Sequence, residues 1–272
     1  MNDWQSHLLA VAHGTREALG GWRRVRDLSV LSIAPGVLLV VACDSNGGIG
    51  PKPRDTVQTS GYELGRLAAR VPLAEMIACG ATPILLIDTL NVEREPTGAT
   101  IIAGIQDEMR DAGMDPAHAL NGSTEDNVPT IATGVGIVVL GLAAEDRFRP
   151  GRAKAGDTVL CVGVPKSAPH YQVVSDDPTI LRPSALRQLA SLDVIGDILP
   201  VGSRGVAAEA HDLAAFAGLP FVPDASPAID MAASGGPGTC CLITVSPEDV
   251  SQVHALPGLP PVFVVGHIEE GS

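Results

Sequence analysis

The sequence contains few aromatic and few basic residues. Phe, Trp and Tyr make up 3% of its 272 residues, and 18 Lys and Arg stand against 31 Asp and Glu, a net charge of −13. So few rings offer no stacking platform for single-stranded nucleic acid, and an acidic surface repels nucleic acid and anionic membranes. The composition therefore predicts no nucleic-acid and no membrane partner. It leaves room for an anionic ligand that is held through metal ions.

The sequence also lacks an apolar run long enough to cross a bilayer, and it does not begin with a basic segment followed by an apolar one. Its cysteines form no CxxC pair and lie in or beside apolar runs, which is typical of reduced thiols in a core. We therefore expect a cytoplasmic protein with buried, free thiols. The cysteines are Cys43, Cys79, Cys161, Cys240 and Cys241.

Signatures of several common catalytic sites are absent as well. The sequence has no GxxxxGK[ST] phosphate loop, no HExxH zinc motif and no Ser-His-Asp elbow. His170 is a lone histidine in an expected loop, and a structural role is its simplest interpretation. The glycine-rich segment 234–239 is most simply a hairpin connection. Zinc and hydrolase chemistry therefore have no support in the sequence.

What is present is a globular pattern of 45% hydrophobic and 18% charged residues. Apolar runs typical of strands and stripes typical of helices follow one another without a regular βαβ repeat, which favours an α+β fold with mixed sheets. The charged segment 145–157, with its Pro and Gly residues, is the expected boundary between domains 1–148 and 155–272. An apolar stripe predicts a helix over 61–80, kinked or split at Pro72.

Other expected elements follow from the same patterns, beginning with a helical lead-in over residues 1–25. We expect strands at 37–43, 83–90, 134–141, 158–164, 239–245 and 261–266. We expect further helices at 97–112, 184–190 and 206–217, and a polar loop at 120–126.

Acidic residues stand at or near the ends of the expected strands. Asp44 follows one strand, Asp88 lies near the end of another, and Glu125 and Asp126 precede a third. Carboxylates at strand ends can converge at one edge of a sheet, where they suit Mg²⁺ that bridges the phosphates of ATP. Singly, Asp44 and Glu125 are more simply turn residues with local hydrogen bonds. Asp88 lies in an apolar run, where an acid is costly unless it is paired or binds a metal.

A loop rich in glycine follows the first of these acids. Gly47, Gly48 and Gly50 permit close approach of backbone to a ligand, and their N–H groups can cradle phosphate. Lys52 in the same loop is a candidate for neutralising a transferred phosphate, and Asp55 for a general base or a further metal ligand. The alternative is a solvated loop with surface charges.

Several segments together resemble one enzyme superfamily. Residues 42–50 read ACDSNGGIG, residues 70–83 read RVPLAEMIACGATP, and residues 235–250 contain GGPGT and PEDV. Together they are similar to aminoimidazole ribonucleotide synthetase and its relatives, which include thiamine-monophosphate kinase. The family's G-G-[ED]-T loop has its nearest match in residues 122–125, where the acid is shifted by one position.

The resemblance implies a PurM-like two-domain fold. Its N-terminal α/β domain would pair with a second copy into a dimeric β-barrel, its C-terminal domain would be α+β, and ATP and Mg²⁺ would bind between them. The implied ATP-binding residues are Asp44, Ser45, Gly47, Gly48, Gly50, Thr124 and Asn127. The implied metal ligands are Asp44, Asp88 and either Glu125 or Asp126.

Segments 44–50 and 123–130 are most similar to a subgroup that includes α-ribazole kinases. The hypothesis is therefore an ATP-dependent kinase for the 5′-hydroxyl of a small nucleoside, α-ribazole in cobalamin lower-ligand salvage. Lys52 and Asp55 would be its catalytic residues. Three alternatives stay open: an ATP-dependent ligase or dehydratase, an enzyme similar to thiamine-phosphate kinase, and a nucleotide-binding regulator without turnover.

Overall fold

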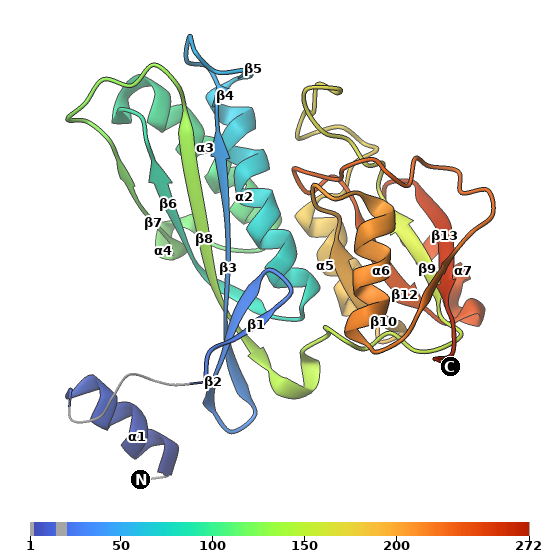
Figure 1. Ribbon diagram of the computed structural model, residues 1–272. Helices are drawn as coiled ribbons and strands as arrows, with labels where there is room; N and C mark the ends of the chain where they lie inside the picture. The colour runs from blue at the N-terminus through green and yellow to red at the C-terminus, as the bar shows by residue number, and fades with distance from the viewer. Residues whose placement is uncertain (1–2, 15–20, 272) are drawn as a thin grey trace.

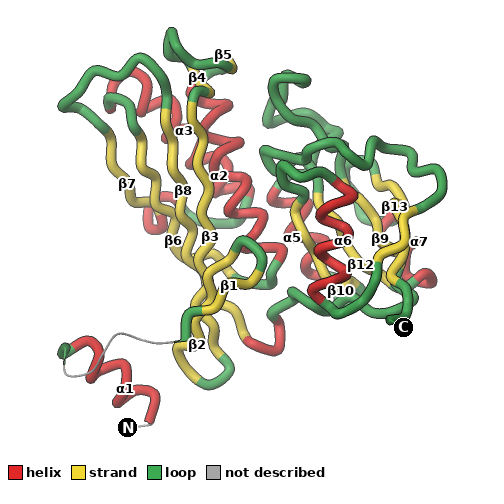
Figure 2. Tube along the Cα trace, in the orientation of Figure 1, coloured by secondary structure: helices red, strands yellow, loops and turns green. Residues whose placement is uncertain are grey.

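The computed structural model describes residues 3–14 and 21–271, which form two main β-sheets and the helices around them (Figure 1). The first sheet comes from the N-terminal half of the chain and the second from the C-terminal half. Helix α2 (Gly61–Ala78) packs on the first sheet and also contacts α5 (Pro183–Ser191) and β10 (Ile195–Pro200). Helices therefore lie between the two sheets (Figure 2). The expected α+β class with mixed sheets is confirmed.

The first sheet has the strand order β1-β2-β3-β8-β6-β7, in which only β6 and β7 are parallel neighbours. Alternate side chains of β3 are buried beneath the helices, and those between them face the opposite, open side. The strands are β1 (Arg23–Val25), β2 (Leu28–Ala34), β3 (Val37–Gly47), β6 (Thr82–Leu90), β7 (Leu120–Thr124) and β8 (Gly134–Ala144). Around them are α1 (Asp3–Ala12), β4 (Ile49–Gly50), β5 (Val57–Gln58), α3 (Ala99–Asp111) and α4 (Pro116–Ala119).

The second sheet is antiparallel throughout, in the order β10-β12-β9-β13-β11. Its central strands β9 and β12 are almost entirely buried, because helices or loops cover both faces. Its elements are β9 (Thr158–Val162), β10, β11 (Phe221–Pro223), β12 (Cys241–Val245), β13 (Val262–Ile268), α5, α6 (Val206–Phe216) and α7 (Val250–His254).

Helix α2 begins at a clear cap, since the Ser60 hydroxyl accepts a hydrogen bond from the N–H of Glu63 at 3.1 Å. It is one continuous helix to Ala78, so the expected split at Pro72 is wrong. Glycines bring α2 and α3 close together. A Cβ on Gly65 would collide with the carbonyl of Ile101 in α3.

A buried cluster of charges joins α2, α3 and the C-terminal half. The carboxylate of Glu108 accepts hydrogen bonds from Arg66 at 2.8 Å and from Arg70 at 2.6 Å. Arg70 also donates to the carbonyls of Ser175 and Leu181. Because Glu108 and Arg70 are almost fully buried, this network fixes the two helices against the loop that precedes α5.

Several sequence predictions need correction. The expected polar loop 120–126 contains β7, an edge strand paired with β6 through its backbone. Most of its side chains are polar and exposed, so the sequence shows no strand pattern there. The lead-in is helical over α1 only, β1 lies within the range predicted to be helical, and residues 1–2 and 15–20 lie outside the described part. Cys43 is exposed, because its side chain lies on the open face of the first sheet.

One hydrophobic cluster extends through both halves of the chain, from Leu73 on α2 to Ile243 on β12. The division into domains 1–148 and 155–272 stays a prediction, since the two sheets share this core. Within residues 3–14 and 21–271, no helix has the length and apolar character that a membrane crossing requires.

Candidate functional site

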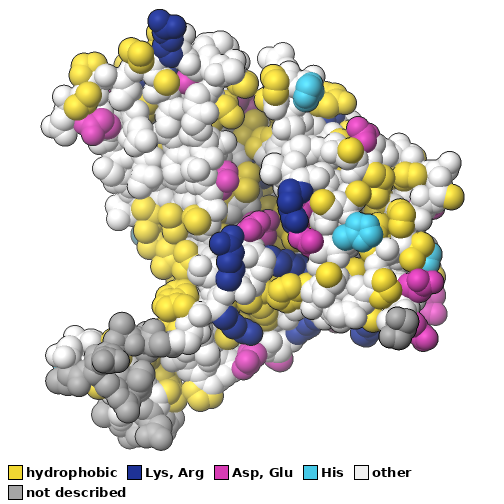
Figure 3. Space-filling model, viewed as in Figure 1, with side chains coloured by type: hydrophobic (Ala, Val, Ile, Leu, Met, Phe, Trp, Pro, Cys, Tyr) yellow, Lys and Arg dark blue, Asp and Glu magenta, His cyan; other side chains and the backbone are white. Residues whose placement is uncertain are grey.

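A pocket of about 430 Å³ lies between the two halves of the molecule, and we name it the interdomain pocket. Figure 3 shows that the surface is hollowed there, with acidic and basic side chains along the hollow. Its volume is within the range of small-molecule sites. The N-terminal half contributes Asp27, Asp44, Ser45, Asn46, Ile49, residues 57–59 and the α2 residues Leu64, Leu67, Val71 and Glu75. The C-terminal half contributes residues from 167–173, 200–203 and 234–238.

Three carboxylates line this pocket and form what we call the acidic cluster. Asp27 comes from the turn between β1 and β2, Asp44 from β3, and Glu75 from α2. Burial raises the pKa of Asp44, with a further contribution from the charge of Asp27, while hydrogen bonds from the backbone of Ser45 and from Asn46 oppose the rise. Burial, followed by the charge of Asp27, raises the pKa of Glu75 to about 8. Asp27 is also paired with Arg24 at 3.3 Å, whereas Asp44 and Glu75 form no ion pair in the described part of the chain.

Mg²⁺ fits this donor set when it arrives with a phosphate-bearing ligand. In the described part of the chain, no three His, Cys, Asp or Glu side chains converge closely enough to enclose a metal ion by themselves. Mg²⁺ does not need such a cage, since it commonly binds one or two carboxylates, water and phosphate oxygens. A cation would also relieve the repulsion between Asp27, Asp44 and Glu75.

The Glu75→Gln variant is expected to be more stable than the wild type above pH 8. The pKa of Glu75 is raised from 4.5 to about 8 in the folded protein, so ionisation opposes folding. The wild type should lose folding stability as the pH rises from 4.5 to 8, and the variant, which has no carboxylate at this position, should not. We expect a gain of about 2 kcal/mol, measured by urea unfolding at about pH 9, and none at about pH 4. An equal gain at both pH values would contradict this account.

The other walls of the interdomain pocket are mainly apolar. Leu64, Leu67 and Val71 form a stripe on α2, and Val201 lies across from it in the C-terminal half. Tyr171 is 51% exposed and offers an aromatic ring. No Lys or Arg is among the described residues that line the pocket. Such a site suits an uncharged, largely apolar ring compound better than an anion.

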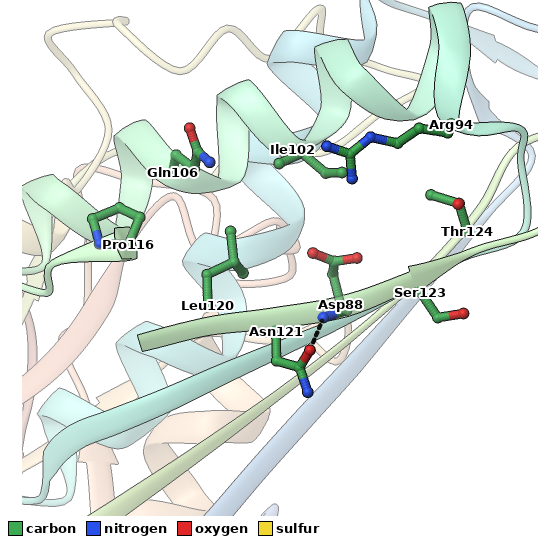
Figure 4. Close-up of a pocket in the computed structure, with 10 residues that line it drawn as sticks. Asp88, Arg94, Ile102, Gln106, Pro116, Leu120, Asn121, Ser123 and Thr124 are labelled. Atoms are coloured by element: carbon green, nitrogen blue, oxygen red, sulfur yellow. Dashed lines mark hydrogen bonds between the residues drawn. The ribbon is translucent and has the colours of Figure 1, made fainter. Parts of the chain in front are cut away.

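Asp88 lies in a different cavity, of about 510 Å³, between the first sheet and α3 (Figure 4). Its side chain points from β6 into the space that Arg94 and Ile102 border. The residue is 2% exposed, and its Oδ1 atom has no hydrogen-bond partner in the described part of the chain. Burial raises the pKa of Asp88 to about 6, although the charge of Arg94 opposes the rise.

The strand register explains why Asp44 and Asp88 line different cavities. Both residues pair with Ile137 of β8, on opposite sides of that strand. Two strand spacings, about 10 Å, therefore separate their backbones. Asp44 lines the interdomain pocket and Asp88 lines the cavity beside α3, while a metal site shared by Asp44, Asp88 and Glu125 or Asp126 stays a prediction.

The glycines after Asp44 shape a loop and do not line the interdomain pocket, whereas Ser45 does. Gly47 pairs with Gly134 in the sheet, and the N–H of Gly48 donates to the Thr133 carbonyl at 2.9 Å. Gly50 has a φ of 146°, and a Cβ there would collide with Thr133. The expected phosphate cradle is corrected for Gly48, because its N–H is already used within the loop.

The expected catalytic pair also has structural roles. Asp55 is buried and accepts hydrogen bonds from the Lys52 N–H at 2.8 Å and from both the N–H and the hydroxyl of Thr133 at 2.7 Å. The Lys52 ammonium lies 2.5 Å from Glu93, and its hydrogen bond, followed by that of Thr97, lowers the pKa of Glu93 to about 2. Neither residue lines the interdomain pocket, and the assignment of Lys52 and Asp55 as catalytic residues stays a prediction.

The segment from Thr124 to Asn127 is a hydrogen-bonded turn. The Glu125 carboxylate accepts from the N–H groups of Asn127 and Val128, and Asp126 accepts from the Thr124 hydroxyl and the Arg94 N–H. Thr124 borders the cavity of Asp88, and none of these residues borders the interdomain pocket. These hydrogen bonds give the segment a role in local structure, and its assignment to ATP or metal binding stays a prediction.

Sequence reasoning missed two of the three clustered acids. Glu75 interrupts the apolar run 73–78, and that interruption is the available signal. The sequence signal for Asp27 is weaker: the residue follows Arg26 in a two-residue turn between short strands. Only the packing of α2 and this turn against the C-terminal half places them near Asp44.

One protein family matches most of the N-terminal half. Residues 25–143 match the family described as AIR synthase related protein, N-terminal domain. This range includes the first sheet up to the last residues of β8, both α2 and α3, and all three residues of the acidic cluster. This part of the chain is therefore similar to AIR synthase-related N-terminal domains.

Two thiamine-monophosphate kinases are similar to this chain over most of its length. Thiamine-monophosphate kinase of Methanospirillum hungatei is 25% identical over 229 residues, 78% of this chain and 76% of the relative. The crystal structure of thiamine-monophosphate kinase from Stenotrophomonas maltophilia has a TM-score of 0.63 at 16% identity and covers 97% of this chain and 93% of its own.

Two ligand-bound structures are also similar. AaThiL complexed with AMPPCP and TMP has a TM-score of 0.61 at 15% identity, covering 98% of this chain and 90% of its own. T. maritima PurL complexed with ATP has a TM-score of 0.64 at 18% identity, covering 89% of this chain and 42% of its own. The likeness extends over both halves and confirms the PurM-like fold.

Proposed function

We propose that this protein is an ATP-dependent kinase that phosphorylates a hydroxyl group of a small, uncharged nucleoside. The relative from Methanospirillum hungatei is a thiamine-monophosphate kinase, and AaThiL and PurL have been seen with AMPPCP and ATP. This supports ATP as the phosphate donor. α-Ribazole is the substrate we propose, on its 5′-hydroxyl.

The observation that carries the choice of acceptor is the lining of the interdomain pocket. Its apolar wall can receive a flat, hydrophobic base, and its described lining includes no Lys or Arg. An acceptor that already carries a phosphate, such as the TMP bound by AaThiL, would bring negative charge towards Asp27, Asp44 and Glu75. A neutral nucleoside brings none.

The residues of the pocket then have distinct roles. Asp27 and Asp44, with Glu75 beside them, would hold Mg²⁺ together with phosphate oxygens, and the ion would supply positive charge against the phosphates of ATP. Asn46 donates to Asp44 at 3.2 Å and orients that carboxylate. The leucines of α2 exclude water from the acceptor side. Catalysis here is mainly positioning and charge neutralisation, as is usual for phosphoryl transfer.

The test is incubation with ATP and Mg²⁺ and a panel of acceptors. The panel contains α-ribazole, adenosine, thiamine, thiamine monophosphate and formylglycinamidine ribonucleotide. A kinase releases ADP and a phosphomonoester, whereas a ligase or dehydratase releases ADP and free phosphate. We expect phosphorylated α-ribazole and no reaction of thiamine monophosphate. Preference for the phosphorylated acceptor would overturn the argument from the pocket lining, and ATP binding without turnover would favour the regulator.

We also propose that the protein is a homodimer through the open face of the first sheet. Val41, Leu140 and Leu85 form an apolar row across three strands of this face, and Val138 and Ile87 belong to the next row. Among the described residues, helix α2 covers the opposite face of β3 and β8, and α1 contacts the sheet at β2 (Figure 1). We expect the wild type to sediment as a dimer and Leu140→Glu as a monomer. A wild type that is monomeric at micromolar concentration would contradict the proposal.

A further inference from the structure

The turn between β1 and β2 has an unusual backbone. Val25 pairs with Leu28, so Arg26 and Asp27 form a two-residue hairpin turn. Arg26 has a φ of 54°, and among the described residues it is the only one other than glycine with a positive φ. Hairpins generally place Gly or Asn at such positions, because a side chain crowds the backbone there. Within the hairpin the Arg24 side chain donates to the Arg26 carbonyl at 3.0 Å, and contacts from outside the hairpin add a stronger restraint.

The C-terminal half provides that restraint. The Arg26 guanidinium donates two hydrogen bonds to Asp197 of β10, at 3.0 and 2.5 Å, and a third to the Ile198 carbonyl at 3.1 Å. It also lies over the ring of Phe216, 5.2 Å from the ring centre. The Asp197 side chain is fully buried and accepts from the N–H of Gly151 as well. The anchor is therefore a rigid, bidentate ion pair between the two halves.

The residue that follows Arg26 is Asp27 of the acidic cluster. Asp27 borders the interdomain pocket and a second cavity, which Arg26 and Phe216 also line. The left-handed backbone of Arg26 sets the direction in which the chain leaves the turn and so where Asp27 stands. We propose that Arg26 is a positioning residue. Its ion pair with Asp197 fixes the turn so that Asp27 faces Asp44 and Glu75 and completes the cation-binding surface.

This role rests on the proposed function, since it treats the acidic cluster as a cation site. The positioning role and simple electrostatics predict opposite effects of removing Arg26 on cation binding. Arg26 lies near enough to Glu75 for its charge to oppose the rise in the pKa of Glu75 that burial and Asp27 cause. Removing that positive charge would by itself tighten binding of a cation. If Arg26 positions Asp27, removing it weakens binding, so the sign of the change separates the two explanations.

The experiment is titration of the full chain with Mn²⁺ in the presence of the ATP analogue AMPPCP, followed by calorimetry and electron paramagnetic resonance. We expect Arg26→Ala to weaken Mn²⁺ binding about tenfold, the usual effect of losing a residue that orients a metal ligand. Arg26→Lys keeps the charge without the bidentate pair and should weaken binding as well. Arg147→Ala is the matched control. Arg147 is 71% exposed, pairs with Asp193 and does not line the interdomain pocket, so its loss should leave binding unchanged.

A further variant guards against misfolding. Arg26→Gly suits the left-handed backbone, so it should fold, as thermal unfolding would verify, and still bind Mn²⁺ more weakly than the wild type. Equal or tighter binding by folded Arg26→Ala and Arg26→Gly would overturn the positioning role and leave the proposed function intact. A wild type that binds no Mn²⁺ together with AMPPCP would overturn both.

Discussion

Asp44→Asn is expected to lower magnesium-dependent turnover of ATP by about a thousandfold, within the range seen when one charge-stabilising group is removed from an active site. Asp44 is half-buried beside two further carboxylates, and an amide has nearly the same shape without the charge that attracts the cation. The measurement is ADP release at saturating nucleoside, with ATP affinity determined in the presence and absence of Mg²⁺. Affinity without Mg²⁺ should change little.

Asp193→Asn is the matched control for this variant. Asp193 has a 95% exposed side chain and lies outside the interdomain pocket, so the same change of charge should leave turnover within about twofold. If Asp44→Asn bound Mg²⁺ and ATP as the wild type does, the acidic cluster would not be the metal site.

Glu108→Ala is expected to destabilise the protein by about 3–5 kcal/mol, the usual effect of removing one partner from a buried ion pair. The variant leaves Arg66 and Arg70 nearly buried without their shared carboxylate. Arg70 keeps only backbone carbonyl partners in the described part of the chain. Urea unfolding at neutral pH measures the effect.

The neighbouring Asp107→Ala variant provides the comparison. Asp107 is 44% exposed and pairs with Arg110 one turn away, so its loss should cost only about 1 kcal/mol. If Glu108→Ala cost no more than Asp107→Ala, water would have to reach the two arginines, and the network would not fix the helices.

The sequence predicted the strands that contain a long apolar run. The apolar runs at 37–43, 83–90 and 134–141 correspond to β3, β6 and β8, which form the centre of the first sheet. Strand β2 was missed because serines interrupt its short apolar run. Strand β7 was missed because its side chains are exposed and its stability comes from backbone pairing with β6.

The site was harder to predict than the fold. Asp44 was found because an acid directly after a long apolar run is visible in the sequence, although β3 itself continues to Gly47. Grouping it with Asp88 assumed that ends of successive strands are neighbours, but β8 lies between β3 and β6. Glu75 and Asp27 belong to a helix and a turn, and no local pattern specifies that they face the same pocket.

The place of α2 between the two sheets has a consequence for how the molecule unfolds. One side of this helix completes the N-terminal core, and the other side packs on α5 and β10. Neither half can bury its apolar surface when the other is absent, so the chain should melt in one cooperative transition, without a stage at which one half survives. The acidic cluster spans the turn, the strand and the helix that this transition releases together. Cation affinity and resistance to heat are therefore properties of a single equilibrium, and an added cation should raise the melting temperature of the whole chain.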